Sequence, residues 1–144
     1  MIRRGCNMAC RIEHANITVR DMEKAVKFIT TALPEFHVRG RDRSERHAWL
    51  HVGTDETYIA LTHSPDAERG KRVAYRDLGI NHVGIVVEDV DAVVARLQAA
   101  GYRQDTEPEV SRWRKRFYFL DDDHLQWEFI QYLTDDPSEK NHYE

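Results

Sequence analysis

The segment Ile12-Glu13-His14-Ala15-Asn16-Ile17-Thr18-Val19-Arg20-Asp21 returns 68 residues later as Ile80-Asn81-His82-Val83-Gly84-Ile85-Val86-Val87-Glu88-Asp89. The alignment needs no gap, and the identical pairs are Ile12/Ile80, His14/His82, Ile17/Ile85, Val19/Val87, Asp21/Asp89 and, just beyond the segment, Val26/Val94. Average residue usage predicts about one identity over such a length. The sequence therefore predicts two copies of one structural unit.

Size and composition indicate a small globular protein. The chain has 144 residues, of which 41% are hydrophobic and 32% charged, so one domain, or two modules around one core, is expected. Apolar stretches are too short for a membrane span, and the N-terminus lacks the apolar segment of a signal peptide. A formal net charge of −4 gives no general attraction to nucleic acid or anionic lipid. We expect a cytoplasmic protein with neither partner, and Cys6 and Cys10 as incidental thiols.

Each half of the chain has the same predicted order of elements. In the first half a strand over 11–19 precedes a helix that Asp21 caps and Pro34 ends, and strands follow near 35–41, 46–52 and 57–63. In the second half the corresponding elements are a strand at 79–87, a helix between Asp89 and Gly101, and strands near 102–106, 114–120 and 125–132. Both halves read βαβββ. Residues 121–124 form the turn before the last strand, and 136–139 could start a short helix at Pro137.

The domain boundaries follow from this repeat. We expect an N-terminal extension at 1–10, one domain at 11–133 with modules at 11–63 and 79–133 joined by a polar linker at 64–78, and a polar tail at 134–144. One helix covers only one face of its sheet. The predicted fold class is α+β, with two βαβββ modules forming a curved, open-barrel mixed sheet and the helices outside.

Alternation along the strands directs polar side chains into the cavity of this barrel. The apolar set in each strand should face the helix, so His14, His82 and Glu128 face the other way. The repeat offset pairs Glu128 with Ala60, which cannot bind a metal. Two imidazoles and one carboxylate suit Fe(II), Mn(II), Ni(II) or Zn(II) and leave coordination positions open.

Glu128 strengthens this interpretation. It lies between Trp127 and Phe129 in a hydrophobic strand, and a carboxylate there is costly unless it is paired or metal-bound. Arg116 on the neighbouring strand is the alternative partner. A substrate with two adjacent oxygens could fill two open positions of a bound metal, which would act as a Lewis acid.

Over residues 11–133 the chain resembles the vicinal oxygen chelate superfamily, which includes glyoxalases, extradiol dioxygenases, fosfomycin-modifying transferases and bleomycin-resistance proteins. The resemblance lies in the two strand starts, Ile12-Glu13-His14 and Ile80-Asn81-His82, and in the closing motif at 117–129, FYFLDDDHLQWEF. Relatives usually have a Gly- and Pro-containing turn there, which this chain lacks. The resemblance implies a homodimer, with the cavity either within one chain or across two, and metal ligands at His14, His82 and Glu128.

The resemblance also suggests the chemistry. The His-His-Glu set looks like the metal triad of extradiol dioxygenases, which favours Fe(II) and a small substrate with vicinal oxygens. Tyr118 matches a tyrosine that hydrogen-bonds the substrate in ring-cleaving relatives. Arg114 and Arg116 could bind a substrate carboxylate, or form a solvated basic face. The remaining predicted substrate-binding residues are Asn16, Gln126 and Tyr132.

Two further functions stay open. A glyoxalase-like lyase or isomerase normally uses a carboxylate at the position of Ala60, whereas fosfomycin-type transferases present the same three ligand types as this chain. A metal-free binding protein of the bleomycin-resistance kind would generally lack the ligand set. Residues 111–116 contain no histidine, although ring-cleaving relatives usually carry an acid–base histidine near this point.

Overall fold

The computed structural model describes residues 10–44, 48–68 and 70–143. The first module contains β1 (His14–Val19), α1 (Met22–Ala32), β2 (His37–Asp42), β3 (Trp49–Gly53) and β4 (Tyr58–His63). Except for Cys10, the predicted extension at 1–10 lies outside the described residues, as do positions 46 and 47 of the predicted third strand. In the part of the chain that is described, no helix is long and apolar enough to cross a membrane.

The second module repeats this order with one addition. It contains β5 (His82–Val86), α2 (Val90–Ala99), β6 (Arg103–Gln104), β7 (Glu109–Val110), β8 (Arg114–Leu120) and β9 (Gln126–Tyr132), and α3 (Pro137–Lys140) follows it. β6 is much shorter than the strand predicted at 102–106, and β7 was not predicted. Both pair with β8, and Pro108 lies between them, where it cannot donate to a strand ladder.

The two long helices begin in the same way. The Asp21 carboxylate accepts from the backbone N–H of Lys24 at 3.0 Å, and that of Asp89 accepts from Ala92 at 3.0 Å. Each bond satisfies an N–H that the first helical turn leaves without a partner. The predicted caps are therefore confirmed, and the identity of these two residues across the repeat has a structural reason.

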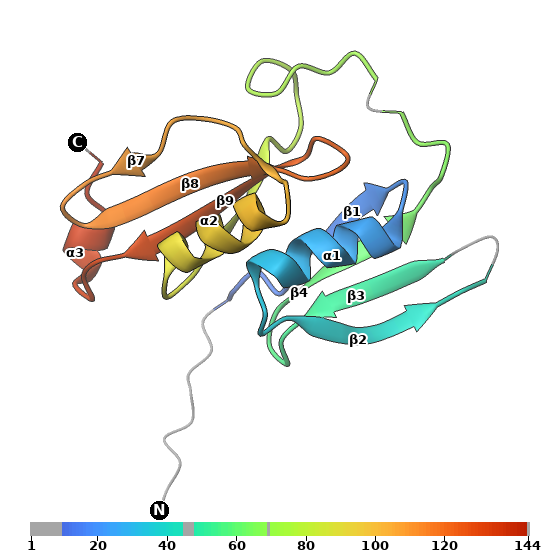
Figure 1. Ribbon diagram of the computed structural model, residues 1–144, viewed down its shortest axis with the longest axis horizontal. Coiled ribbons are helices and arrows are strands. Elements are labelled where there is room, and N and C mark those ends of the chain that lie inside the picture. Colours follow the sequence, from blue (N-terminus) through green and yellow to red (C-terminus); the bar gives the residue numbers. More distant parts are fainter. Residues whose placement is uncertain (1–9, 45–47, 69, 144) are drawn as a thin grey trace, which may run out of the picture.

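The strands form two mixed sheets, with the orders β1-β4-β3-β2 and β5-β9-β8-β6. The parallel pair in each sheet joins the first and last long strands of its module. Each helix lies across one face of its own sheet, and the two sheets stand side by side (Figure 1). The α+β class and the two βαβββ modules are confirmed, and the barrel is open: among the described strands, none of one sheet pairs with a strand of the other.

The modules share one hydrophobic core on the helix sides of the sheets. Phe28 of α1 reaches Trp127 of β9, with ring centroids 5.6 Å apart. Arg96 of α2 donates to the carbonyls of Thr31 and Ala32, at 3.0 and 2.8 Å, and so satisfies two carbonyls at the end of α1. Because the core uses the helix sides, the opposite face of each sheet remains open.

The turn before β9 forms without glycine or proline. Oδ1 of Asp121 accepts from the backbone N–H groups of Asp123 and Leu125, both at 2.9 Å, and Oδ2 accepts from the Trp127 indole at 3.0 Å. His124 takes the left-handed conformation, with φ of 60°. Burial raises the pKa of Asp121 above its ordinary value, although these donors lower it. The Asp121 side chain therefore fixes a turn that glycine and proline more commonly form.

Gly53 and Gly40 both lie in the first sheet, but they differ in the space that is available to a side chain. A Cβ at Gly53 would lie 2.2 Å from the Thr57 carbonyl oxygen and 2.5 Å from Cα of Tyr58, whereas at Gly40 its nearest neighbour is the Trp49 ring at 3.7 Å. We expect Gly53→Ala to lower the free energy of unfolding by about 1–3 kcal/mol. Gly40→Ala should be neutral or stabilising, by up to about 1 kcal/mol. Urea unfolding followed by tryptophan fluorescence measures both, and equal values would contradict the packing at Gly53.

Candidate functional site

The open face of the second sheet holds an imidazole–carboxylate pair. His82 is the first residue of β5, and Glu128 is the third residue of the adjacent β9. Nε2 of His82 lies 2.8 Å from Oε2 of Glu128. The Glu128 residue is only 6% exposed, so its charge is almost fully removed from water. Such a carboxylate is stable only with compensating partners.

Arg116 brings a positive charge close to Glu128. Its Nε lies 3.7 Å from Oε1 of Glu128, and its Nη1 lies 3.4 Å from Oε2 of Glu109. The two Glu128 oxygens therefore face different partners, His82 on one side and Arg116 on the other. The alternative predicted from the sequence, an ion pair with Arg116, forms alongside the contact with His82.

Tyr118 completes this group. It is the cross-strand neighbour of Glu128, and its ring centroid lies 5.8 Å from that of His82. Burial and the negative charge of Glu128 raise the pKa of Tyr118 above its ordinary value, while Arg116 opposes this shift. Tyr118 therefore keeps its proton at neutral pH and can donate a hydrogen bond to an anionic oxygen.

Gly84 lies next to Glu128 on the adjacent strand β5. It is the Cα partner of Glu128, and a Cβ built on it would lie 3.6 Å from Oε2 of that residue. Any longer side chain at this position would extend over the carboxylate.

The linker between the modules contributes Tyr75, which the sequence analysis did not identify. Its hydroxyl lies 2.9 Å from Nδ1 of His82 and donates to Oε1 of Gln126. Nε2 of Gln126 in turn donates to Asp105 at 2.5 Å. Tyr75 lies in a polar segment without periodicity, so no sequence pattern could have placed it in the site. Gln126, which the sequence assigned to substrate binding, is occupied by these contacts.

The first sheet presents a different open face, and His14 lies there. His14 Nδ1 lies 3.0 Å from Oε1 of Glu13, and its ring stacks on Tyr58 with centroids 4.7 Å apart. His51 continues the stack, 4.6 Å from Tyr58, and is the Cα partner of the buried Ala60. Asn16, the other predicted site residue here, accepts a hydrogen bond from Thr62 at 3.1 Å.

Within one chain, no hydrogen bond, ion pair or ring contact of the described residues therefore joins His14 to His82 or Glu128. Over residues 10–44, 48–68 and 70–143, no group of three or more His, Cys, Asp and Glu side chains is placed to hold a metal. The structure brings His82, Glu128, Tyr118, Arg116 and Gln126 together, and it places His14 and Asn16 on the other module.

Arg114 and Tyr132, the last two residues predicted for the site, contact the C-terminal segment. Arg114 is buried and donates from Nη1 to the carbonyl of Lys140 at 3.1 Å. Tyr132, its cross-strand partner, lies beneath the Lys140 ammonium, 5.5 Å from the ring centroid. This segment thus covers the far end of the open face, and Arg116 is the arginine that remains next to Glu128.

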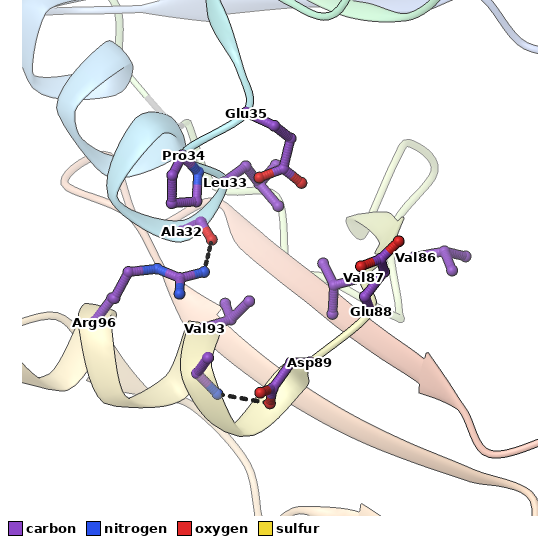
Figure 2. Close-up of a pocket in the computed structure, with 11 residues that line it drawn as sticks. Ala32, Leu33, Pro34, Glu35, Val86, Val87, Glu88, Asp89, Val93 and Arg96 are labelled. Atoms are coloured by element: carbon purple, nitrogen blue, oxygen red, sulfur yellow. Dashed lines mark hydrogen bonds between the residues drawn. The ribbon is translucent and has the colours of Figure 1, made fainter.

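A groove of about 580 Å³ lies elsewhere, between the end of α1 and the start of α2. Figure 2 shows Arg96 directed at the Ala32 carbonyl, and Glu35 and Glu88 on the opposite walls. The Arg96 guanidinium is engaged by helix carbonyls. The groove brings no imidazole to these carboxylates, so the open face of the second sheet is the stronger candidate for chemistry.

Comparisons with known proteins agree with the fold. The family model described as "Glyoxalase/Bleomycin resistance protein/Dioxygenase superfamily" matches residues 11–129. The chain therefore belongs to this superfamily. No curated protein sequence matches it.

Solved structures with this fold include enzymes and binding proteins. The chain is similar to a glyoxalase family protein from Bacillus cereus, with a TM-score of 0.73, 18% identity, and coverage of 90% of this chain and 99% of that one. It is also similar to the trypanothione-dependent glyoxalase I of Leishmania major (TM-score 0.65, 23% identity, 85% and 87% covered). A third is TnmS3, an antibiotic binding protein from a Streptomyces species (TM-score 0.61, 22% identity, 86% and 97% covered).

The raised pKa of Tyr118 gives a prediction about the site. Replacing Glu128 with glutamine removes the negative charge but not the burial, so the pKa of Tyr118 should fall and still stay above its ordinary value. NMR titration of ¹³Cζ-labelled tyrosines measures it. Tyr102 is the control, because burial and Asp122 raise its pKa. A shift common to both tyrosines would contradict a direct effect of Glu128.

Proposed function

We propose that this superfamily member is a metal-dependent enzyme that acts on a small molecule with vicinal oxygens. His82 and Glu128 would hold a divalent metal ion together with His14 of a second copy of the chain. The His82–Glu128 pair is the observation that carries this proposal. Its two atoms lie 2.8 Å apart on an open sheet face, with the carboxylate buried and a tyrosine and an arginine beside it.

The donor set fits a divalent metal. A neutral imidazole nitrogen and a carboxylate oxygen both present lone pairs, and at 2.8 Å they need a positively charged species near them, either a proton or a metal ion. Fe(II) is the favoured ion, and Mn(II), Ni(II) and Zn(II) accept the same donors. The site would be incomplete without a third ligand, which this chain carries at His14 on its other module.

A homodimer in which modules of different chains face each other would supply that ligand. The shared core of one chain lies on the helix sides of both sheets, so the open faces of its two modules are free to meet those of a partner subunit. His14 is also 44% exposed at its side chain and so remains available. Closed two-fold symmetry would create two equivalent sites.

The chain's own residues can then bind and orient the substrate. When bound, the metal would act as a Lewis acid toward two adjacent substrate oxygens, and Fe(II) would add the capacity for dioxygen chemistry. Tyr118 keeps its proton and would donate to a developing oxyanion. Arg116 would bind a substrate carboxylate while it remains near Glu128. Arg114 and Tyr132 would form the end of the cavity under the C-terminal segment.

Dioxygen dependence separates the enzyme classes. We favour the extradiol-type dioxygenase because Ala60 takes the place of the carboxylate that glyoxalase-like isomerases use. That branch predicts turnover that stops without oxygen. A glyoxalase-like lyase or a fosfomycin-type transferase would turn over its substrate equally well under nitrogen.

A metal-free binding protein is the second candidate. Two observations favour it: Glu128 already has two cationic or protonatable partners, His82 and Arg116, and the similar structure TnmS3 is an antibiotic binding protein. In this case the His82–Glu128–Arg116 group would be a structural ion-pair network. Metal analysis decides between the two candidates.

We predict close to one metal ion per chain in wild-type protein purified without chelator or a nickel column, or after adding Fe(II), Mn(II), Ni(II) or Zn(II). Glu128→Ala should lose it, because a carboxylate ligand is removed. Glu109→Ala is the matched control, since it removes the other carboxylate that contacts Arg116. Elemental analysis by mass spectrometry measures the content. A wild-type protein that binds none of these ions would favour the binding protein.

Mixing variants tests whether the site spans two chains. His14→Ala and Glu128→Ala should each lack metal, but their heterodimer would contain one intact site. Random exchange of subunits should restore about a quarter of the wild-type metal content. The control mixture of His82→Ala with Glu128→Ala should restore none, because both changes lie in the same module. If neither mixture recovers any metal, the shared site is ruled out.

A further inference from the structure

Two arginines on the open face of the second sheet share one surface carboxylate. Arg114 and Arg116 lie two residues apart on β8, so both side chains project from the same face of the sheet. Oε1 of Glu109 lies 4.0 Å from Nε of Arg114, and Oε2 of Glu109 lies 3.4 Å from Nη1 of Arg116. The Glu109 carboxylate thus turns one oxygen toward each guanidinium group.

Both contacts of Glu109 are loose. A charge-assisted hydrogen bond between a guanidinium and a carboxylate is about 2.7–2.9 Å long, and both distances exceed it. The register of the strands gives the reason: Glu109 is the cross-strand partner of Arg116, so Arg114 is only its diagonal neighbour. Held in this register, the carboxylate reaches neither arginine at the distance of a charge-assisted hydrogen bond.

Arg114 keeps a buried donor that has no acceptor. The residue is only 6% exposed, and its Nη1 donates to the Lys140 carbonyl at 3.1 Å. Its Nε is buried as well, but it makes no hydrogen bond with any of the described residues. A buried donor without an acceptor is unfavourable. An oxyanion that lay closer to Nε than the Glu109 carboxylate would therefore be stabilised here.

The balance of charges shows which group must leave when another oxyanion enters. With Glu109 and Glu128 in place, two carboxylates balance the two arginines. The side chain of Glu128 is 8% exposed, whereas that of Glu109 is 51% exposed. Glu109 belongs to β7, a strand of two residues at the outer edge of the second sheet (Figure 1). Because a half-exposed ion pair contributes little to stability, Glu109 can turn to water and leave its position to a ligand.

We propose that Arg114 and Arg116 form a binding site for a ligand carboxylate, and that Glu109 occupies this site in the free protein. The ligand displaces Glu109 and accepts hydrogen bonds from both arginines, including the one from Nε of Arg114. Glu109 then determines specificity, because only a carboxylate that fits both guanidinium groups better than Glu109 does will displace it. That this carboxylate belongs to the substrate rests on the proposed function, whereas the site itself needs no metal.

The test uses acetate as the probe and protein that a chelator has freed of metal. Sodium acetate replaces sodium chloride at constant ionic strength and pH, while ¹H–¹⁵N spectra follow the assigned Nε–H signals of Arg114 and Arg116. We expect the Arg114 signal to shift and to saturate, because its Nε gains an acceptor. Acetamide, which has nearly the same shape as acetate but no charge, should leave the signal unchanged at the same concentrations.

Glu109→Gln is the decisive variant, because it removes the internal carboxylate and keeps both arginines. Its affinity for acetate should be about 2–5-fold higher than that of wild type, as expected when a partly exposed ion pair no longer competes. Glu107→Gln is the matched control. It removes the same charge from an exposed side chain two residues earlier, which forms no ion pair with either arginine, so its acetate affinity should equal that of wild type.

Three results would overturn the carboxylate site. The first is an Arg114 signal that acetate does not shift, and the second is an equal acetate affinity in Glu109→Gln and wild type. The third is an equal rise in affinity in Glu107→Gln, because the loss of a negative charge would then explain the effect without any displacement. Since the titration contains no metal, a protein that binds acetate as expected but no metal ion would refute the proposed function and leave the carboxylate site standing.

Discussion

A buried carboxylate on an open sheet face organises the polar groups of the second module. Removing Glu128 from water is unfavourable unless its oxygens have partners, and the surrounding residues are arranged to supply them. His82 faces one oxygen and Arg116 lies nearest to the other. Gly84 places no side chain next to Glu128, and the Tyr75 hydroxyl lies beside Nδ1 on the other side of the imidazole. The positions of His82 and Gly84 depend on the parallel pairing of β5 with β9, and that of Arg116 on the antiparallel pairing of β8 with β9.

Sequence alone predicts the fold well, because the repeat and the hydrophobic alternation carry it. The helix caps at Asp21 and Asp89, the final strand and the two modules all follow from local patterns with a physical cause. The short β6 and the additional β7 were missed. Pro108 was visible in the sequence, but the way the two strands pair with successive parts of β8 is not. Similarly, nothing in the residue types of the linker indicated that Tyr75 would reach His82.

The site was predictable only where strand alternation governs it. That principle places His82, Glu128, Tyr118 and Arg116 on one face, and the structure does bring them together. It gives no information on how two sheets are placed relative to each other, so it could not tell whether His14 joins this group within one chain. Alternation also assigns Arg114 to the open face, but not the C-terminal segment that covers it, because that contact depends on tertiary packing.

The division between the two faces of each sheet has an evolutionary consequence. The hydrophobic core lies on the sides of the sheets that α1 and α2 cover, while the candidate site residues lie on the opposite faces. Substitutions at the exposed positions of these faces therefore leave the core contacts intact. One scaffold can thus diversify its ligands and reactions while its folding determinants stay under separate selection.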